Sequence, residues 1–328
     1  MRAVVTGGTG FIGSHLVDAL RARGDEVACV GRPGATRRWL VAAPVEFLTV
    51  GVNDVKQLTR AFEGADVVFH LAGCNHAPSR AELYALNTEG TACVARAAAA
   101  LGTAAPHIIF ASSVAAVGSC GDGERLTAES TPRPLSRYGR SKILAEAVIH
   151  AYADRIPATI LRLPSVYGPR ERGVYKFFRG IRRGFALTVG SWDREVSLIY
   201  IKDLVQGLLA TAAVDRKAAA ARIYYLTHPD PVTWETFARS VGQELGRQPI
   251  LISVPEPLAR VIARSAEGIA ALRGRSASLN RERVHEIAQR RWVCDPSRAI
   301  DELGFRPQFP IARGVPETVA WYREAGWL

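Results

Sequence analysis

Residues 2–13 read RAVVTGGTGFIG, and this stretch decides the fold. Its first four residues are mostly apolar and predict a short buried strand. The glycines that follow predict a dinucleotide cradle, because Gly7 permits a tight turn, Gly10 lets the backbone approach a pyrophosphate, and Gly13 lets a helix pack closely on the strand. Apolar residues at helical spacing come next, so free N–H groups at a helix N-terminus would face the phosphates. The alternative is a tight strand-to-helix connection without a ligand.

A second pattern predicts a pair of residues for proton transfer. Tyr138 and Lys142 lie four residues apart in a stretch that predicts a helix from about residue 138 to residue 152, so both fall on one face. A free tyrosine titrates near ~10, and bringing its pKa to ~7 requires about 4 kcal/mol. A lysine ammonium about 4 Å away supplies a term of that order at an effective dielectric of about 20. A surface pair with the same spacing is the alternative.

Ser113 favours the interpretation as a proton-transfer pair. It ends the apolar run HIIFASS (107–113), a predicted strand, and parallel α/β sheets place their ligands at the C-terminal ends of the strands. A hydroxyl at this place holds a substrate oxygen that Tyr138 protonates or deprotonates. The sequence therefore predicts three residues that act together, Ser113, Tyr138 and Lys142.

In order and spacing, these segments resemble the extended short-chain dehydrogenase/reductases, also called the NAD-dependent epimerase/dehydratase family. Further matching segments are DVVFHLAG (66–73), NTEGT (87–91), RLPSVYGPR (162–170) and YIKDL (200–204), so the likeness covers essentially the whole chain. It implies a Rossmann-type α/β fold, a doubly wound parallel sheet with a smaller C-terminal α/β substrate domain. The expected division is 1–165 with 198–228 for the cofactor domain, and 166–197 with 229–328 for the substrate domain.

The resemblance also implies an NAD(P)-dependent enzyme with hydride transfer between the nicotinamide and a substrate carbon. Tyr138 would be the general acid or base, Lys142 would lower its pKa and hold the nicotinamide ribose, and Ser113 would orient the reacting oxygen. No metal is expected. The implied cofactor-binding set is Gly7, Gly10, Phe11, Ile12, Gly13, Arg32, Val52, Leu71, Ala72, Gly73, Tyr138, Lys142 and Pro164.

The end of the second predicted strand indicates which nicotinamide cofactor is preferred. Sites that prefer NAD usually carry a carboxylate there, whereas this chain reads VGRP (30–33), with Arg37 and Arg38 shortly after. A guanidinium can hold a 2′-phosphate through two hydrogen bonds, so we expect NADP(H), with NAD(H) as the alternative if Arg32 is a solvated loop charge. Gly51 stands where the family commonly has Asp, which leaves the adenine contact to the backbone and Val52.

Departures from the family pattern indicate the substrate class. Relatives that act on nucleotide sugars usually have Asn, Arg and Tyr where this chain has Ser165, Val196 and Val117. Loss of a pyrophosphate-binding arginine removes a charge-assisted contact of roughly 1.5–3 kcal/mol, although Arg194, Arg170 or Arg172 could replace it. The pattern is closer to the dihydroflavonol reductase and 3β-hydroxysteroid dehydrogenase branch. We therefore expect a ketone or secondary alcohol on an apolar substrate, with a nucleotide-sugar epimerase or dehydratase, or a catalytically silent sensor, as alternatives.

Two further features bear on partners. Residues 255–272 have apolar side chains at helical spacing with arginines on the other face, and packing on neighbouring helices is favoured there over contact with a membrane. His76 and Arg80 either line the substrate pocket or are solvated loop residues.

Composition sets the remaining bounds. The chain has 328 residues, 48% of them hydrophobic, which suits two domains of unequal size. Its five cysteines are scattered without a CxxC pair, and Met1 leads directly into the first strand, so we expect a cytoplasmic protein with reduced thiols. The net charge of +11 is spread along the chain without a nucleic-acid-binding module, so we expect small-molecule ligands and no nucleic acid. A homodimer is expected from the resemblance alone.

Overall fold

The computed structural model describes residues 1–40, 45–214, 221–272 and 280–328. Its centre is a seven-stranded, all-parallel sheet in the order β11-β6-β5-β4-β1-β2-β3. The strands are β1 (Arg2–Thr6), β2 (Glu26–Gly31), β3 (Glu46–Thr49), β4 (Val67–His70), β5 (His107–Ser113), β6 (Ala158–Leu163) and β11 (Arg222–Tyr225). The central strands are mostly apolar because helices cover both faces of the sheet. The expected doubly wound sheet is confirmed.

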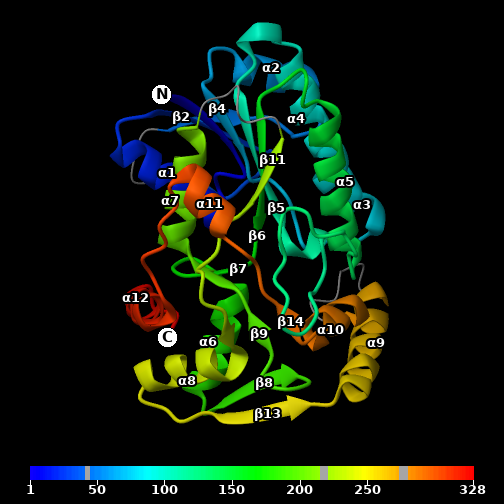
Figure 1. Ribbon diagram of the computed structural model, residues 1–328, viewed down its shortest axis with the longest axis vertical. Helices are drawn as coiled ribbons and strands as arrows, with labels where there is room; N and C mark the ends of the chain where they lie inside the picture. The colour runs from blue at the N-terminus through cyan, green and yellow to red at the C-terminus, as the bar shows by residue number, and fades with distance from the viewer. Residues whose placement is uncertain (41–44, 215–220, 273–279) are drawn as a thin grey trace.

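Helices form a layer on each side of this sheet (Figure 1). One layer contains α1 (Phe11–Ala22), α7 (Ile201–Ala212) and α11 (Ser297–Leu303), and the other contains α2 (Val55–Phe62), α4 (Gly90–Ala99) and α5 (Arg137–Ala151). Each layer has its own apolar core, with Leu16 and Leu204 in the first and Leu58 and Ile149 in the second. Short segments complete this part of the chain: α3 (Arg80–Tyr84), the π-helical turn η1 (Ala85–Glu89), and the 3-10 helices η2 (Gly102–Ala104) and η3 (Val114–Ala116).

A smaller α/β unit lies below the carboxyl ends of the main strands in Figure 1. Its strands form three small sheets: β7 (Ser165–Tyr167) with β10 (Leu198–Tyr200), β8 (Phe185–Val189) with β13 (Ile250–Val254), and β12 (Val232–Thr233), β9 (Glu195–Val196) and β14 (Arg291–Trp292) together. Its helices are α6 (Gly173–Arg182), α8 (Trp234–Glu244), α9 (Glu256–Leu272), α10 (Arg281–Ala288) and α12 (Ile311–Glu324). Fully buried aromatic rings such as Tyr167, Phe237 and Tyr322 belong to the same core as the first helical layer and join the two units.

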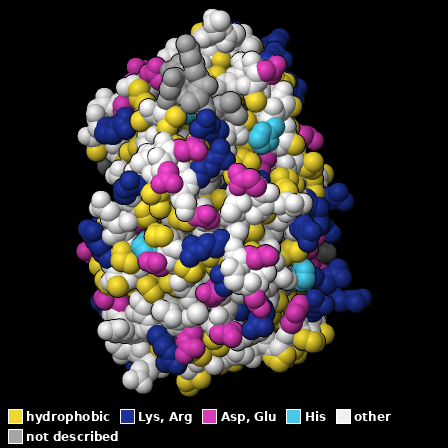
Figure 2. Space-filling view, viewed as in Figure 1, with side chains coloured by type: hydrophobic (Ala, Val, Ile, Leu, Met, Phe, Trp, Pro, Cys, Tyr) yellow, Lys and Arg dark blue, Asp and Glu magenta, His cyan; other side chains and the backbone are white. Residues whose placement is uncertain are grey.

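Helix α9 occupies the segment for which the sequence predicts an amphipathic helix. It packs on its neighbours through the small side chains of Ala259 and Ala263, which are 3% and 0% exposed. Its large apolar side chains face solvent instead, with exposed fractions of 48–63% for Leu258, Val261, Ile262 and Ile269. In Figure 2, hydrophobic and basic side chains gather at the lower right, where α9 lies. The favoured packing is present, and it leaves an apolar surface uncovered.

Three further observations concern the cysteines, membrane crossing and metal binding. All five cysteines lie in the described part of the chain, and each is a free thiol. None of the described helices combines the length and hydropathy that crossing a bilayer requires. The described residues also contain no cluster of His, Cys, Asp and Glu side chains able to hold a metal ion.

Candidate active site

The glycine turn between β1 and α1 forms a cradle that side chains would fill. Gly7 has a φ of +76°, and a Cβ there would lie 2.8 Å from the backbone nitrogen of Ala72. A Cβ on Gly13 would collide with the carbonyl oxygen of Gly7. Helix α1 begins after Gly10 without any side-chain cap, so its first N–H groups stay available for a ligand. The cradle fits the phosphates of a dinucleotide.

The cradle opens into a cavity of about 450 Å³ at the carboxyl ends of β1, β4, β5 and β6. Its lining includes most of the expected cofactor and catalytic residues: Gly7, Gly10, Phe11, Ile12, Gly13, Leu71, Gly73, Ser113, Tyr138, Lys142 and Pro164. Residues from five separate segments therefore meet around one space large enough for the nicotinamide half of a cofactor.

Three residues of the expected cofactor set lie outside that lining. Ala72 contributes backbone, which Gly7 approaches closely, and Val52 packs beside Gly90 at the start of α4. Arg32 is exposed just after the end of β2. Burial raises the pKa of the Cys74 thiol, and the charge of Arg32 is among the groups that lower it, so this guanidinium lies near the cavity.

Helix α5 brings Tyr138 to the end of β5. The Ser136 side chain caps the helix by accepting a hydrogen bond from the Gly139 N–H at 3.1 Å. A Cβ on Gly139 would collide with the carbonyl oxygen of Ala115, so the helix rests directly on the turn that follows Ser113. Removal of the Tyr138 hydroxyl from bulk water raises its pKa, and a hydrogen bond with Ser113 lowers it. Tyr138 is therefore protonated at neutral pH in the free protein.

Lys142 contacts a backbone carbonyl and an aromatic ring in the free protein. Its ammonium donates a hydrogen bond to the carbonyl oxygen of Ala111 at 2.8 Å and lies 4.9 Å from the centre of the Phe110 ring. Burial lowers the pKa of Lys142 to about 8, while the charge of Glu146 raises it.

Asn87 is a buried residue whose role the sequence did not reveal. Its side chain accepts a hydrogen bond from the Cys74 N–H at 2.9 Å and donates to the Cys74 carbonyl and to the Ser141 hydroxyl at 2.8 and 2.9 Å. It thus holds the loop after β4 against α5, beside Lys142. The segment NTEGT matched the family, yet nothing in the sequence showed which contacts this amide makes.

A second cavity of about 260 Å³, the inner pocket, lies on the other side of Tyr138 and Ser113. Half of its fourteen lining residues are apolar, namely Val114, Ala115, Pro164, Val196, Trp234, Ile287 and Trp292. Two of the three residues that depart from the family pattern, Ser165 and Val196, line this pocket. The third, Val117, is buried in the core beside Leu126 and faces no described pocket. Arg283 and Glu286 of α10 also line the inner pocket, and sequence reasoning missed both.

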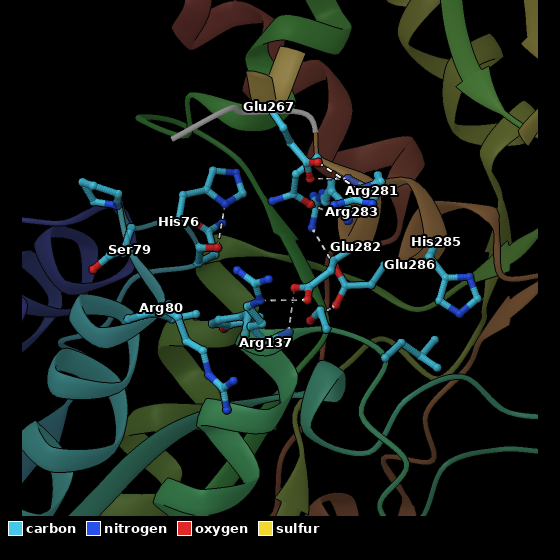
Figure 3. A pocket seen from close by; sticks show the side chains of 18 of the residues that line it. His76, Ser79, Arg80, Arg137, Glu267, Arg281, Glu282, Arg283, His285 and Glu286 are labelled. Carbon is cyan, nitrogen blue, oxygen red and sulfur yellow. Dashed lines mark hydrogen bonds and ion pairs between the residues drawn. The ribbon is translucent and has the colours of Figure 1, made fainter. Parts of the chain in front are cut away.

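Tyr138 also lines a third cavity of about 490 Å³, the outer pocket. Figure 3 shows the charged side chains around it. His76 and Arg80 line it, so they face a cavity rather than an open loop surface. Acidic and basic side chains from α5, α9 and α10 alternate around it, with ion pairs between Arg137 and Glu282 at 3.2 Å and between Arg281 and Glu267 at 2.9 Å.

The carboxylates of α10 attach that helix to the start of α5. Glu282 accepts a hydrogen bond from the Arg137 N–H at 2.8 Å, and Glu286 accepts one from the Ser136 hydroxyl at 2.5 Å. Two groups of the smaller unit therefore hold the helix that carries Tyr138 and Lys142.

The arginines considered as replacements for a pyrophosphate ligand have other contacts. Arg170 pairs with Asp18 at 2.8 Å, and Arg172 lies over the Trp327 ring at 5.8 Å. Arg194 is buried and donates to the carbonyl oxygen of Ser191 at 2.6 Å. None of the three lines the cofactor cavity, the inner pocket or the outer pocket.

Comparisons with known proteins agree with this geometry. The model of the NAD dependent epimerase/dehydratase family matches residues 3–226. The ceramide reductase of Caulobacter vibrioides is 28% identical, covering 99% of this chain and 95% of the relative. The 3beta-hydroxysteroid-dehydrogenase/decarboxylase isoform 1 of Arabidopsis thaliana is 26% identical, over 96% of this chain and 78% of the relative. Among solved structures, the dTDP-glucose 4,6-dehydratase of Streptomyces venezuelae, which holds NAD, is similar with a TM-score of 0.81 and 25% identity, over 100% and 98% of the two chains.

Proposed function

The chain belongs to the NAD-dependent epimerase/dehydratase family of extended short-chain dehydrogenase/reductases, and from this we propose that it uses NADP(H) to interconvert a ketone and a secondary alcohol on a largely apolar substrate. One observation carries the proposal. Ser113 and Tyr138 line both the cofactor cavity and the inner pocket, and apolar side chains make up half of the residues around the inner pocket. A substrate carbon in the inner pocket would therefore lie between these hydroxyls and the cofactor.

Each residue of the set has a chemical role in this reaction. The bound nicotinamide supplies the hydride. Tyr138, protonated at neutral pH, donates its proton to the substrate oxygen during reduction, and the Ser113 hydroxyl donates a hydrogen bond to the same oxygen. Lys142, held against Ala111, places its ammonium where it can bind the ribose of the cofactor.

The substrate class is supported by the relatives and by the pocket. A ceramide reductase and a 3β-hydroxysteroid dehydrogenase are named for substrates with large apolar skeletons. The three arginines that the sequence offered as pyrophosphate ligands, Arg170, Arg172 and Arg194, line none of the three cavities.

Turnover with NADPH tests the proposed function. We expect medium- and long-chain ketones or steroid ketones to cause net NADPH oxidation. Net consumption would be absent, and the cofactor would stay bound to the purified protein, if the enzyme were an epimerase or dehydratase that recycles its cofactor internally.

Arg32 is expected to decide the cofactor preference. Calorimetric titration should show NADPH binding at least about tenfold tighter than NADH, a margin of ~1.4 kcal/mol. Replacement of Arg32 with alanine should remove that margin, because the exposed guanidinium is free to bind a 2′-phosphate through two hydrogen bonds. Arg37→Ala is the matched control, since its guanidinium lies over the Phe47 ring at 3.7 Å. Equal affinities for NADPH and NADH in the unmodified protein would contradict the preference.

Lys142 is expected to make cofactor binding depend on pH. Its pKa of about 8 means that the ammonium predominates below that pH and is lost above it. If the ammonium binds the ribose, the affinity for NADPH should fall by about tenfold between pH 7 and pH 9, with its midpoint near the pKa of the free enzyme. Lys142→Met should bind weakly with no such midpoint. A flat profile in the unmodified protein would exclude this role.

A further inference from the structure

Two charged side chains line the inner pocket, and half of the residues around it are apolar. Arg283 and Glu286 lie three residues apart on α10 and both line the inner pocket together with Ser113 and Tyr138. Figure 3 labels both on α10 among the residues of the outer pocket, so the two pockets share this pair. Both charges act on the Tyr138 hydroxyl, since Glu286 raises its pKa and Arg283 lowers it. The pair therefore lies close to the place of reaction.

Contacts with the described residues leave both side chains of the pair able to bind a ligand. One oxygen of Glu286 accepts the hydrogen bond of Ser136 at 2.5 Å, and the other lies 3.7 Å from a guanidinium nitrogen of Arg283. That separation is too long for a hydrogen bond. The Glu286 side chain is 11% exposed and that of Arg283 is 47% exposed, and both line the inner pocket, so each can contact a molecule bound there.

A carboxylate accepts hydrogen bonds and a guanidinium donates them. A hydroxyl group can donate to the first and accept from the second through a single oxygen atom. We propose that Arg283 and Glu286 recognise a hydroxyl group on the carbon chain near the reacting carbonyl, so that the substrate is a hydroxylated ketone. The proposal rests on the proposed function and adds the polar group that selects the substrate.

Glu286 also has a structural contact, and the experiment separates the two roles. Its bond to Ser136 supports the cap of α5, so losing this bond would displace Tyr138 and slow the reaction of every ketone alike. Losing the recognition of a hydroxyl would instead slow only substrates that carry one. The ratio of kcat/KM between two matched ketones is therefore the informative measurement.

The probes are 1-hydroxydecan-3-one and decan-3-one, which differ only in the hydroxyl group. With NADPH, the unmodified enzyme should prefer the hydroxy ketone by about 10- to 100-fold in kcat/KM, the order expected of a hydrogen bond to a charged group. Glu286→Gln, which keeps an acceptor for Ser136, and Arg283→Met should each reduce this preference by about tenfold. Ser136→Ala should lower both rates and leave the ratio unchanged. Glu235→Gln and Arg290→Met are the charge-matched controls, because these side chains are exposed and line none of the three cavities.

Equal kcat/KM values for the two ketones in the unmodified enzyme, or an unchanged ratio in both the Glu286 and Arg283 variants, would overturn the proposal while leaving the oxidoreductase function intact. A binding measurement tests the recognition of the hydroxyl group if neither ketone is reduced. Calorimetry with NADP present compares decane-1,3-diol with decan-3-ol. If neither ketone is reduced but the diol binds more tightly and the Glu286 and Arg283 variants remove the difference, the recognition stands and the proposed reaction fails.

Discussion

Replacement of Tyr138 with phenylalanine should lower the rate of NADPH-dependent ketone reduction by about a thousandfold, within the range that general acid catalysis contributes. The phenyl ring fills the same space but has no proton to give. In the free protein the pKa of Tyr138 lies above its usual value because its hydroxyl is enclosed, so the group that is lost is a proton donor at neutral pH. Single-turnover kinetics with saturating NADPH measure the effect on the chemical step.

The matched control removes another tyrosine hydroxyl. Tyr224 donates a hydrogen bond to Glu302 at 2.6 Å, away from the three cavities, so Tyr224→Phe should keep its rate within a factor of a few. Tyr138→Phe should also bind NADPH with unchanged affinity, which would show that the cofactor cavity is intact. A Tyr138→Phe enzyme with an undiminished rate would rule out its assigned role and would favour a protein that binds cofactor without using it for chemistry.

The largest effect on stability is expected at the buried ion pair between α5 and β6. Arg162 donates to both oxygens of Glu146, with the shortest contact at 2.8 Å, and the two side chains are only 3% and 1% exposed. The Ser112 hydroxyl donates to the same carboxylate. Glu146→Ala leaves a guanidinium buried without its partner, so we expect a loss of about 3–5 kcal/mol in the free energy of unfolding. Urea denaturation followed by circular dichroism measures it.

A surface pair and a double variant test the reason for this effect. Arg222 and Glu302 are also 2.8 Å apart but are 43% and 34% exposed, so Glu302→Ala should cost less than about 1 kcal/mol. The double replacement Glu146→Leu with Arg162→Met should recover part of the loss, because no unpaired charge remains. If Glu146→Ala cost no more than Glu302→Ala, burial would not be the cause.

Sequence patterns predicted the parts of the fold that depend on local geometry. The glycine turn, β5 ending at Ser113 and the helix that carries Tyr138 each follow from residues within one short segment, and the structure forms all three elements. The match to the family extends this to the order of the strands. The surroundings of a residue could not be predicted where they depend on segments far away in the sequence. Val117 was expected to face the pocket, yet Leu126, Tyr225 and Cys294 enclose it in the core.

The polar side of the inner pocket could not be read from the sequence for the same reason. Arg283 and Glu286 look like ordinary charges on a short helix, RERVHEIA, with nothing to indicate a cavity. They reach Tyr138 only because α10 lies against the start of α5, about 145 residues earlier in the chain. The hydrogen bond of Lys142 could not be predicted either. Its spacing from Tyr138 predicted that the two residues share a helix face, but not that the ammonium bonds to Ala111.

The attachment of α10 to α5 has a consequence for recombining this protein with its relatives. Exchanging the C-terminal region to change substrate range would also exchange the acceptors for the Ser136 hydroxyl and the Arg137 N–H. A chimera with foreign residues at 282 and 286 would inherit a catalytic helix with a weakened first turn, and its poor activity would be mistaken for poor substrate fit. A productive crossover therefore keeps these four positions from the same parent.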